Sequence, residues 1–240
     1  MKVEVCSTSL EGIKNAAQAG ADRIELCSSL ELGGITPSKG LIEQAVSLNL
    51  LDIHCLIRPR AGHFTYTEEE VKIIEQDILF AREAGCHGIV IGALTNEFKL
   101  DFPLLTHWRR LAGSMYLTFH RAIDVVVNPM TAIEQLIDLH FDCILSSGQQ
   151  EKAIDGFQNL KSWHKVFGNQ ILVMPGGGVN EENCMRFKSE GFKAIHLSGS
   201  KINNPIAIPE GVNTEISFLN QRWSESNVSK IQEVVTRVKA

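Results

Sequence analysis

The sequence of 240 residues predicts a single-domain (β/α)8 barrel, the TIM-barrel fold, over residues 1–240. Three observations favour this fold. Short apolar runs recur eight times within residues 1–200, helix-like segments separate them, and no low-complexity linker divides the chain. Parallel strands require crossover connections of this kind, and eight such units close a barrel. A doubly wound open sheet is the competing architecture, but it would be favoured by GxGxxG after the first strand, where this chain has CSTSLEG.

The eight predicted strands are short segments in which β-branched and aliphatic residues dominate. In order they are KVEVC (2–6), RIELC (23–27), DIHCLIR (52–58), GIVIG (88–92), MYLTFH (115–120), DCILS (142–146), ILVMP (171–175) and AIHLSG (194–199). Amphipathic patterns between them predict helices over 10–20, 67–85, 128–140 and 181–191. Three of these segments end at a glycine, which favours a helix C-cap: Gly20, Gly85 and Gly191.

The C-terminal part of the chain is less regular. Residues 201–226 read as a long loop that contains Pro and Asn, and residues 227–240 read as an amphipathic helix that closes the outer ring between strands eight and one. A loop of this length is typical of a lid or a subunit contact, and a plain surface excursion is the alternative. The sequence leaves open whether the chain forms a homo-oligomer.

Composition excludes several classes of partner. The net charge of −5 provides no basic footprint for nucleic acid. No apolar run approaches the ~18 residues of a membrane span, and the N-terminus lacks the apolar stretch of a signal peptide. The six cysteines have no paired local spacing and are expected to be reduced thiols. We therefore expect a cytoplasmic protein with neither membrane nor nucleic acid as a partner.

The interior of the predicted barrel is unusually polar. Alternate strand residues face the lumen and the surrounding helices, and we assign the more apolar set to the helix side, where both layers bury apolar surface. The remaining set lines the lumen: Glu4, Cys6, Arg23, Glu25, Cys27, His54, Arg58, Thr118, His120, Ser146, Met174, His196 and Ser198. Ordinary barrel interiors are filled by Val, Ile and Leu, so this polar lining is the strongest functional signal in the sequence.

The predicted lumenal glutamates, Glu4 and Glu25, require partners, and Arg23, Arg58 and Arg60 are the available cations. A structural ion-pair network that fixes strand register is the alternative to a functional role for Glu4, Arg23 and Glu25. TIM-barrel active sites lie at the carboxyl ends of the strands. The better site candidates are therefore Cys6, Cys27, Arg58, His120 and His196 or Ser198.

Two thiols, Cys6 and Cys27, end neighbouring predicted strands, which lie roughly 4.8 Å apart. Their sulfurs would reach one soft metal ion. Two thiolates acting alone favour Cu(I), whereas zinc prefers about four ligands. The alternative is a pair of reduced thiols packed as small hydrophobic side chains. The same alternation assigns Cys55 and Cys143 to the helix-facing core.

Glycine-rich loops follow the last predicted strands: SSGQQ (146–150), PGGGVN (175–180) and LSGSK (197–201). In barrels, such loops after strands seven and eight often hold phosphate, because glycine lets backbone N–H groups approach an anion. Tight turns without a ligand are the alternative. The predicted anion site consists of Arg60, Arg121, Gly176, Gly177, Gly178, Ser198 and Gly199. His120 and Glu25 are the acid–base candidates, and Arg58 is a further catalytic candidate.

Five segments resemble the CutC family of copper-homeostasis proteins: RIELCSSLELGGITPSKG, IRPRAGHFTY, TFHRAID, LSSG and VMPGGGV. The resemblance runs in order from residue 3 to about residue 199. It implies a TIM barrel, a cytoplasmic location and copper handling through Cu(I). It also implies that Cys6 and Cys27 occupy the positions of the family's proposed copper-binding thiols. No enzymatic activity is firmly attached to this family.

The chain departs from the family pattern in three places. His63 stands where the segment RPRGGDF has an acid, and Ile123 replaces the Phe of HRAFD. The segment SGSKINNPIAIPEG lacks the Arg-bearing stretch and the aromatic-x-Asn motif of the family.

The sequence supports two functional hypotheses. The principal one is a cytosolic copper-homeostasis protein that binds Cu(I) through Cys6 and Cys27. The alternative is a TIM-barrel enzyme of isomerase, lyase or hydrolase type that acts on a small phosphorylated or otherwise anionic metabolite. A barrel that only contacts a partner protein would leave the polar lumen unexplained.

Overall fold

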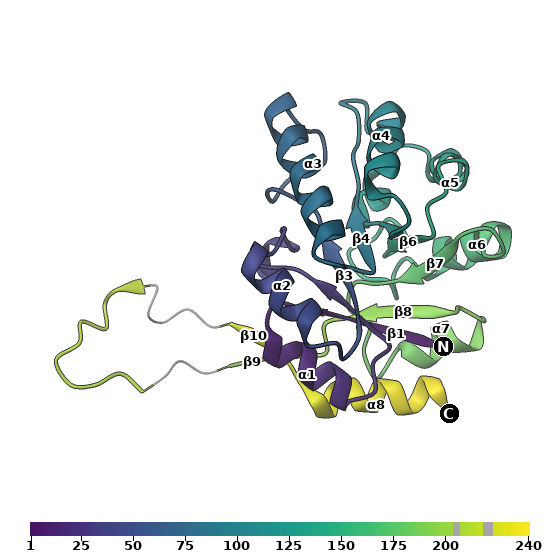
Figure 1. Ribbon diagram of the computed structural model, residues 1–240. Coiled ribbons are helices and arrows are strands. Elements are labelled where there is room, and N and C mark those ends of the chain that lie inside the picture. Colours follow the sequence, from purple (N-terminus) through teal and green to yellow (C-terminus); the bar gives the residue numbers. More distant parts are fainter. Residues whose placement is uncertain (204–206, 218–222) are drawn as a thin grey trace.

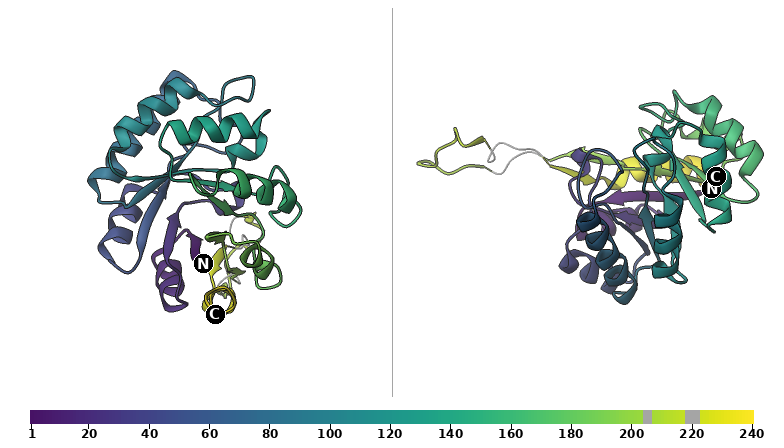
Figure 2. Two further views of the ribbon diagram at one scale, coloured as in Figure 1. Left: turned by 90° about the vertical axis from the view of Figure 1, so that its right-hand side faces the viewer. Right: turned by 90° about the horizontal axis from the view of Figure 1, so that it is seen from above.

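The structure is a computed structural model that describes residues 1–203, 207–217 and 223–240. Eight parallel strands form one sheet in the order β7-β6-β5-β4-β3-β2-β1-β8, and β8 comes to lie beside β7 (Figure 1, Figure 2). The strands are β1 (Lys2–Ser7), β2 (Arg23–Leu26), β3 (Asp52–Leu56), β4 (Gly88–Ile91), β5 (Tyr116–Phe119), β6 (Cys143–Ser146), β7 (Leu172–Pro175) and β8 (Ala194–Leu197). The predicted TIM barrel is confirmed, and each of the eight barrel strands overlaps its predicted segment.

Helices cover the outside of this nearly closed barrel (Figure 2). They are α1 (Leu10–Gln18), α2 (Lys39–Ser47), α3 (Glu68–Glu83), α4 (Phe102–Ala112), α5 (Pro129–Asp138), α6 (Phe157–Phe167), α7 (Cys184–Ser189) and α8 (Val228–Lys239). The predicted start of α3 is a capping box, in which Thr67 and Glu70 each bind the other's backbone N–H. Gly85, with φ of +87°, provides the left-handed residue that follows this helix.

The main apolar core lies between the strands and the helices. Val3, Val5, Ile24 and Leu26 are fully buried in it, as the alternation of β1 and β2 predicts. Their neighbours in sequence, Glu4 and Glu25 among them, face the opposite side, which is the barrel lumen. Burial of one apolar face therefore fixes which polar side chains enter the lumen.

The lumen is divided into a polar half and an apolar half. Strands β8, β1, β2 and β3 contribute the charged and histidine side chains, whereas Cys143, Leu145, Met174 and Ala194 form an apolar cluster on β6, β7 and the first residue of β8. The predicted orientation of β6 is wrong, because Cys143 faces the lumen and Ser146 does not. The Ser146 hydroxyl donates to Asp124 Oδ1 at 2.5 Å, so its polarity serves the loop after the strand rather than the lumen.

The C-terminal region contains one confirmed element and one correction. Helix α8 buries Ile231, Val234, Val235 and Val238 and packs against α1 and α7, as predicted. The ends of the predicted 201–226 loop are paired instead, because β9 (Ser200–Ile202) and β10 (Ser224–Ser226) form an antiparallel ribbon. Residues 207–217 project away from the barrel (Figure 1). The parts of the predicted loop at 204–206 and 218–222 lie outside the described residues.

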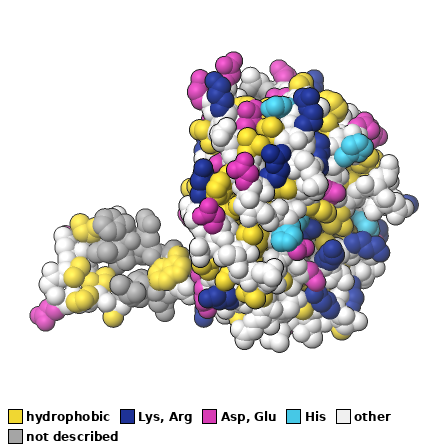
Figure 3. Space-filling model, viewed as in Figure 1, with side chains coloured by type: hydrophobic (Ala, Val, Ile, Leu, Met, Phe, Trp, Pro, Cys, Tyr) yellow, Lys and Arg dark blue, Asp and Glu magenta, His cyan; other side chains and the backbone are white. Residues whose placement is uncertain are grey.

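The surface shows no separation of charge on the face viewed in Figure 3, where Lys and Arg are interspersed with Asp and Glu. Within the described part of the chain, no helix combines the length and apolarity needed to cross a membrane.

Candidate functional site

A cavity of ≈ 290 Å³ opens at the carboxyl ends of the barrel strands. Its polar lining consists of Cys6, Glu25, Arg58, His120, Arg121, Gly177, Gly178, His196 and Ser198, and its apolar lining of Leu30, Leu56, Phe64, Leu145 and Leu197, with Gly33 at the rim. Active sites of TIM barrels lie at this end. Most predicted site residues therefore meet in one cavity, while Cys27, Arg60, Gly176 and Gly199 lie outside its lining.

Below the cavity, Glu4 connects three strands through two strong interactions. Its carboxylate accepts a hydrogen bond from Arg23 Nε at 2.5 Å and one from His196 Nδ1 at 2.7 Å. The Arg23 guanidinium also lies over the Tyr116 ring, 5.0 Å from its centre. Burial alone would raise the pKa of Glu4, but Arg23 and His196 outweigh it and lower that pKa to about 2. Glu4 is therefore a buried carboxylate ion with both oxygens bonded.

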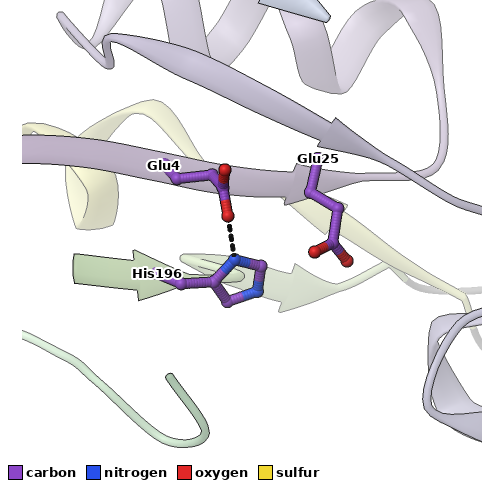
Figure 4. A group of neighbouring side chains, drawn as sticks. All are labelled: Glu4, Glu25 and His196. Carbon is purple, nitrogen blue, oxygen red and sulfur yellow. Dashed lines mark hydrogen bonds and ion pairs between the residues drawn. The ribbon is translucent and has the colours of Figure 1, made fainter. Parts of the chain in front are cut away.

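Glu25 is the opposite case. Its side chain is 6% exposed, and no described residue forms a hydrogen bond with Oε2. Burial raises the pKa of this carboxyl to about 7. Figure 4 shows the Glu25 carboxylate turned toward the ring of His196, which also holds Glu4. Burial lowers the pKa of His196, but contacts with Cys6, Glu25 and Glu4 raise it well above its usual value.

The two predicted metal-binding thiols are neighbours, but they are not opposite each other. In the β1–β2 register Cys6 stands opposite Glu25, and Cys27 lies two positions farther along. Cys6 lines the cavity, whereas Cys27 is fully buried against Leu56 and Val90. Burial and the nearby Cys6 raise the pKa of Cys27. All six cysteines are free thiols.

His120 is held as a neutral ring at the cavity wall. Its Nδ1 accepts a hydrogen bond from the Ala122 backbone N–H at 3.2 Å, so the ring proton resides on Nε2. Burial and the Arg58 charge lower its pKa to about 3. The Nε2–H group has no partner among the described residues. A Cβ at Gly92 would lie 2.5 Å from this ring, which explains the glycine there. His120 is therefore a hydrogen-bond donor rather than a base at neutral pH.

Arg58 is the first of two arginines that follow β3, and the hydrogen-bond acceptors of its guanidinium are backbone carbonyl groups. Arg58 donates to the carbonyls of Leu32, Gly33, Gly34 and Gly62, so it holds two loops at the cavity mouth. Its Nε has no partner among the described residues.

Arg60 lies outside the cavity and forms an ion pair with Glu70, with Nε to Oε1 at 2.5 Å. Its other nitrogens donate to backbone carbonyls, including that of Thr65. The predicted grouping of Arg60 with the anion site therefore differs from its observed position.

Arg121 reaches the cavity from the loop after β5. Its Nε donates to Asp124 at 2.8 Å and one terminal nitrogen donates to Ser147 Oγ at 2.6 Å. Asp124 also accepts from the backbone N–H of Ser147 and of Gln149, so it organises the loop after β6. The other terminal nitrogen, Nη1, faces Gly177, where an added Cβ would lie 3.5 Å away. No described residue accepts a hydrogen bond from Nη1.

The glycine-rich loops split into a lining pair and a packing pair. Gly177 and Gly178 line the cavity with φ of +100° and +73°, a conformation that L-residues rarely adopt. Gly176 and Gly199 lie against other side chains, because an added Cβ would come 2.4 Å from Leu145 or from Ile231. In the described part of the chain, nothing accepts a hydrogen bond from the backbone N–H groups of Gly177, Gly178 and Ser198.

One lining residue that sequence reasoning missed is Phe64. Its ring packs 4.7 Å from the His120 ring centre, and the Arg58 guanidinium lies 5.1 Å from its own centre. It follows no strand alternation, because it lies in the loop after β3. The only feature of the sequence that could have indicated a role at the site is the position of Phe64 near two arginines in RPRAGHF.

The family model of CutC matches residues 1–201. The chain belongs to the CutC family. A CutC family protein of Pasteurella multocida is 40% identical over 200 residues, covering 83% of this chain and 82% of its own. A CutC family protein of Bacteroides thetaiotaomicron is 35% identical and covers 99% of this chain and 96% of its own length. The resemblance to the CutC family that the sequence motifs indicate is confirmed.

A solved CutC structure agrees with the fold. The crystal structure of the putative copper homeostasis protein CutC from Streptococcus agalactiae is 32% identical, with a TM-score of 0.79 over 82% of this chain and 98% of that chain. KGPDC from Streptococcus mutans matches with a TM-score of 0.63 at 11% identity over 99% of this chain and 97% of that chain, which shows the shared barrel alone.

Two departures from the CutC pattern lie away from the cavity lining. His63 is exposed and its Nδ1 lies 2.6 Å from the Thr65 hydroxyl. Ile123 is fully buried in the main core. Neither side chain contacts the cavity, so both substitutions leave its lining unchanged.

Proposed function

We propose that this CutC protein takes part in copper homeostasis in the cytoplasm by binding Cu(I) through the thiolates of Cys6 and Cys27. One observation supports this best: two free thiols on hydrogen-bonded neighbouring strands face the same lumen, close enough that Cys6 contributes to raising the pKa of Cys27. Two soft thiolates select Cu(I) over harder ions. The S. agalactiae relative, described as a putative copper homeostasis protein, supports the same assignment.

The surroundings of the two thiols suit a low-coordinate soft ion. Cys6 borders the cavity and provides an entry path, and the apolar side chains around Cys27 exclude water from the other side. The thiols must lose their protons to bind the metal. Because burial raises the pKa of Cys27, the Cu(I) affinity is expected to fall as the pH is lowered.

The double variant Cys6→Ser/Cys27→Ser is expected to lose at least a hundredfold in Cu(I) affinity. Titration of the reduced protein against a competing chelator measures this loss. Cys55→Ser is the matched control, because Cys55 is equally buried but faces the helices. Unchanged affinity in the double variant, or an equal loss in the control, would contradict Cu(I) binding by this pair.

A second candidate function is supported by a separate set of groups. The cavity gathers hydrogen-bond donors without acceptors in the described chain: Arg121 Nη1, His120 Nε2–H and the N–H groups of Gly177, Gly178 and Ser198. Such donors fit the oxygens of a phosphate or carboxylate. With Glu25 as a proton donor or acceptor near neutral pH, the site suits an isomerase, lyase or hydrolase acting on a small anionic metabolite.

Gly177→Asp tests this second candidate, because it places a carboxylate among the anion donors. A thermal-shift screen with phosphorylated metabolites is expected to give a rise in Tm for the parent protein and none for the variant. At a ligand concentration of 100 Kd the stabilisation is about 2.7 kcal/mol. Gly211→Asp is the control, since Gly211 has a similar φ of +88° in open space. The candidate fails if no metabolite stabilises the protein, or if Gly177→Asp responds like the control.

A further inference from the structure

Three ionisable side chains converge between the cavity and the barrel centre: Glu4 on β1, Glu25 on β2 and His196 on β8 (Figure 4). One oxygen from each carboxyl group and one ring nitrogen all lie within 4.8 Å of one another. All three residues are buried, with exposures of 1%, 6% and 9% for Glu4, Glu25 and His196. Buried acidic groups this close together repel when ionised, so a cation between them would stabilise the arrangement.

Glu25 provides the observation that points to a ligand. Its Oε2 is buried, lacks any hydrogen-bond partner in the described chain and belongs to a side chain that lines the cavity. An unsatisfied buried oxygen costs about 1–3 kcal/mol, so native proteins rarely leave one without a role. Both carboxylate oxygens of the neighbouring Glu4 already accept hydrogen bonds, so Glu25 is the carboxyl of this cluster with an unbonded oxygen.

The hydrogen bonds around the cluster match those that support a metal ligand. Arg23 binds Oε2 of Glu4 and leaves Oε1 directed at His196 Nδ1, 2.7 Å away. Ligating carboxylates are commonly fixed by a second hydrogen bond of this type, which sets the orientation of the ligating oxygen. A metal ion at this position would replace the proton shared by Glu4 and His196 and would gain Glu25 as its third ligand.

We propose that Glu4, Glu25 and His196 form a binding site for a divalent transition-metal ion, with its remaining coordination positions open to the cavity. Two carboxylate oxygens and an imidazole nitrogen suit Zn²⁺ or Mn²⁺ and do not suit Cu(I), which prefers thiolates. The site uses neither Cys6 nor Cys27 as a ligand, although Cys6 contacts His196 and stands opposite Glu25. The ion would face the anion donors of Arg121 and Gly177 across the same cavity, and an anionic ligand would contact both.

The test uses metal-free full-length protein, equilibrium dialysis against Zn²⁺ or Mn²⁺, and thermal unfolding with and without each metal. We expect one bound ion per chain and a rise in Tm. Glu25→Gln and His196→Gln are each expected to weaken binding at least tenfold. Glutamine has the size of glutamate, and Glu25 Oε2 has no hydrogen-bond partner that the substitution could remove, so Glu25→Gln is expected to retain the fold. The variant Cys27→Ser leaves Cys6 beside His196 and is expected to bind Zn²⁺ and Mn²⁺ like the parent while losing Cu(I).

A surface site is the main competing explanation, and the chain contains a matched control for it. His107 Nε2 lies 3.1 Å from Glu75 on the outer surface and forms a histidine–carboxylate pair of the kind that binds adventitious zinc. His107→Gln is expected to leave binding unchanged. The proposal is overturned if His107→Gln removes the bound ion, if Glu25→Gln binds like the parent, or if neither metal binds.

Discussion

Replacement of Arg23 by Met is expected to lower the free energy of unfolding by about 3–5 kcal/mol at pH 7. Glu4 is 1% exposed, and Arg23 Nε donates to it at 2.5 Å. Methionine retains an apolar side chain beside Met174 and Tyr116 but removes the positive charge, so the Glu4 carboxylate loses its main counter-charge. Breaking a buried pair in this way leaves an uncompensated charge, which is far costlier than losing a surface ion pair. Urea unfolding followed by circular dichroism measures the change.

The double variant Glu4→Gln/Arg23→Met is the matched control, because it removes both charges together. It is expected to recover most of the lost stability, since neutral replacement of a complete buried pair is often tolerated. A loss below about 1 kcal/mol in the single variant, or no recovery in the double variant, would contradict this role.

The strand alternation was predictable wherever one face of a strand is clearly apolar. In β1 and β2 the valines, isoleucine and leucine enter the main core, and Glu4 and Glu25 follow into the lumen as expected. The alternation rule failed in β6. The polar Ser146 hydroxyl donates a hydrogen bond to Asp124 in a neighbouring loop, and Cys143 faces the lumen instead. The sequence does not show whether a hydroxyl at the end of a strand faces the lumen or forms a hydrogen bond with an adjoining loop.

The register between strands was not predictable from the sequence. The similar segments KVEVC and RIELC suggest that like residues lie opposite each other, but Glu4 pairs with Arg23 and Cys6 pairs with Glu25. Strands of a barrel tilt and therefore shift along one another, and the size of the shift between two strands cannot be derived from the sequence of either strand. This shift separates the two thiols diagonally, and it brings Glu25 next to Cys6 and His196.

Loop positions were the least predictable part of the site. Arg58 and Arg60 are two residues apart, yet one lines the cavity and the other pairs with Glu70 outside it. The donors of the proposed anion site are mostly backbone N–H groups, and whether each lacks an acceptor depends on the conformation of its loop. The sequence identifies the glycines, but only the structure distinguishes the two that line the cavity, Gly177 and Gly178, from the two that pack against side chains, Gly176 and Gly199.

Replacement of Glu25 by Gln is expected to raise the free energy of unfolding of the metal-free protein by about 1–3 kcal/mol at pH 8. The folded-state pKa of Glu25 is about 7, against an ordinary value of 4.5. Between these values the folded state binds more protons than the unfolded state, so the stability of the parent protein falls as the pH rises through this window. Glutamine is never ionised and avoids this loss. The difference between the two proteins should shrink to about 0.4 kcal/mol near pH 4.5, where Glu25 is half-protonated in the unfolded state and almost fully protonated in the folded state.

Glu70→Gln is the control with the opposite sign. Hydrogen bonds from Arg60 and the Thr67 N–H lower the pKa of Glu70, so its removal should destabilise the protein at neutral pH. Urea unfolding from pH 4.5 to 8 in the presence of a chelator distinguishes the two cases. Equal stability of Glu25→Gln and the parent at pH 8 would show that Glu25 ionises without cost in the folded state. A gain at pH 8 would instead show that the fold keeps a destabilising carboxyl in its lumen, and metal or substrate binding at this position is the physical reason to retain it.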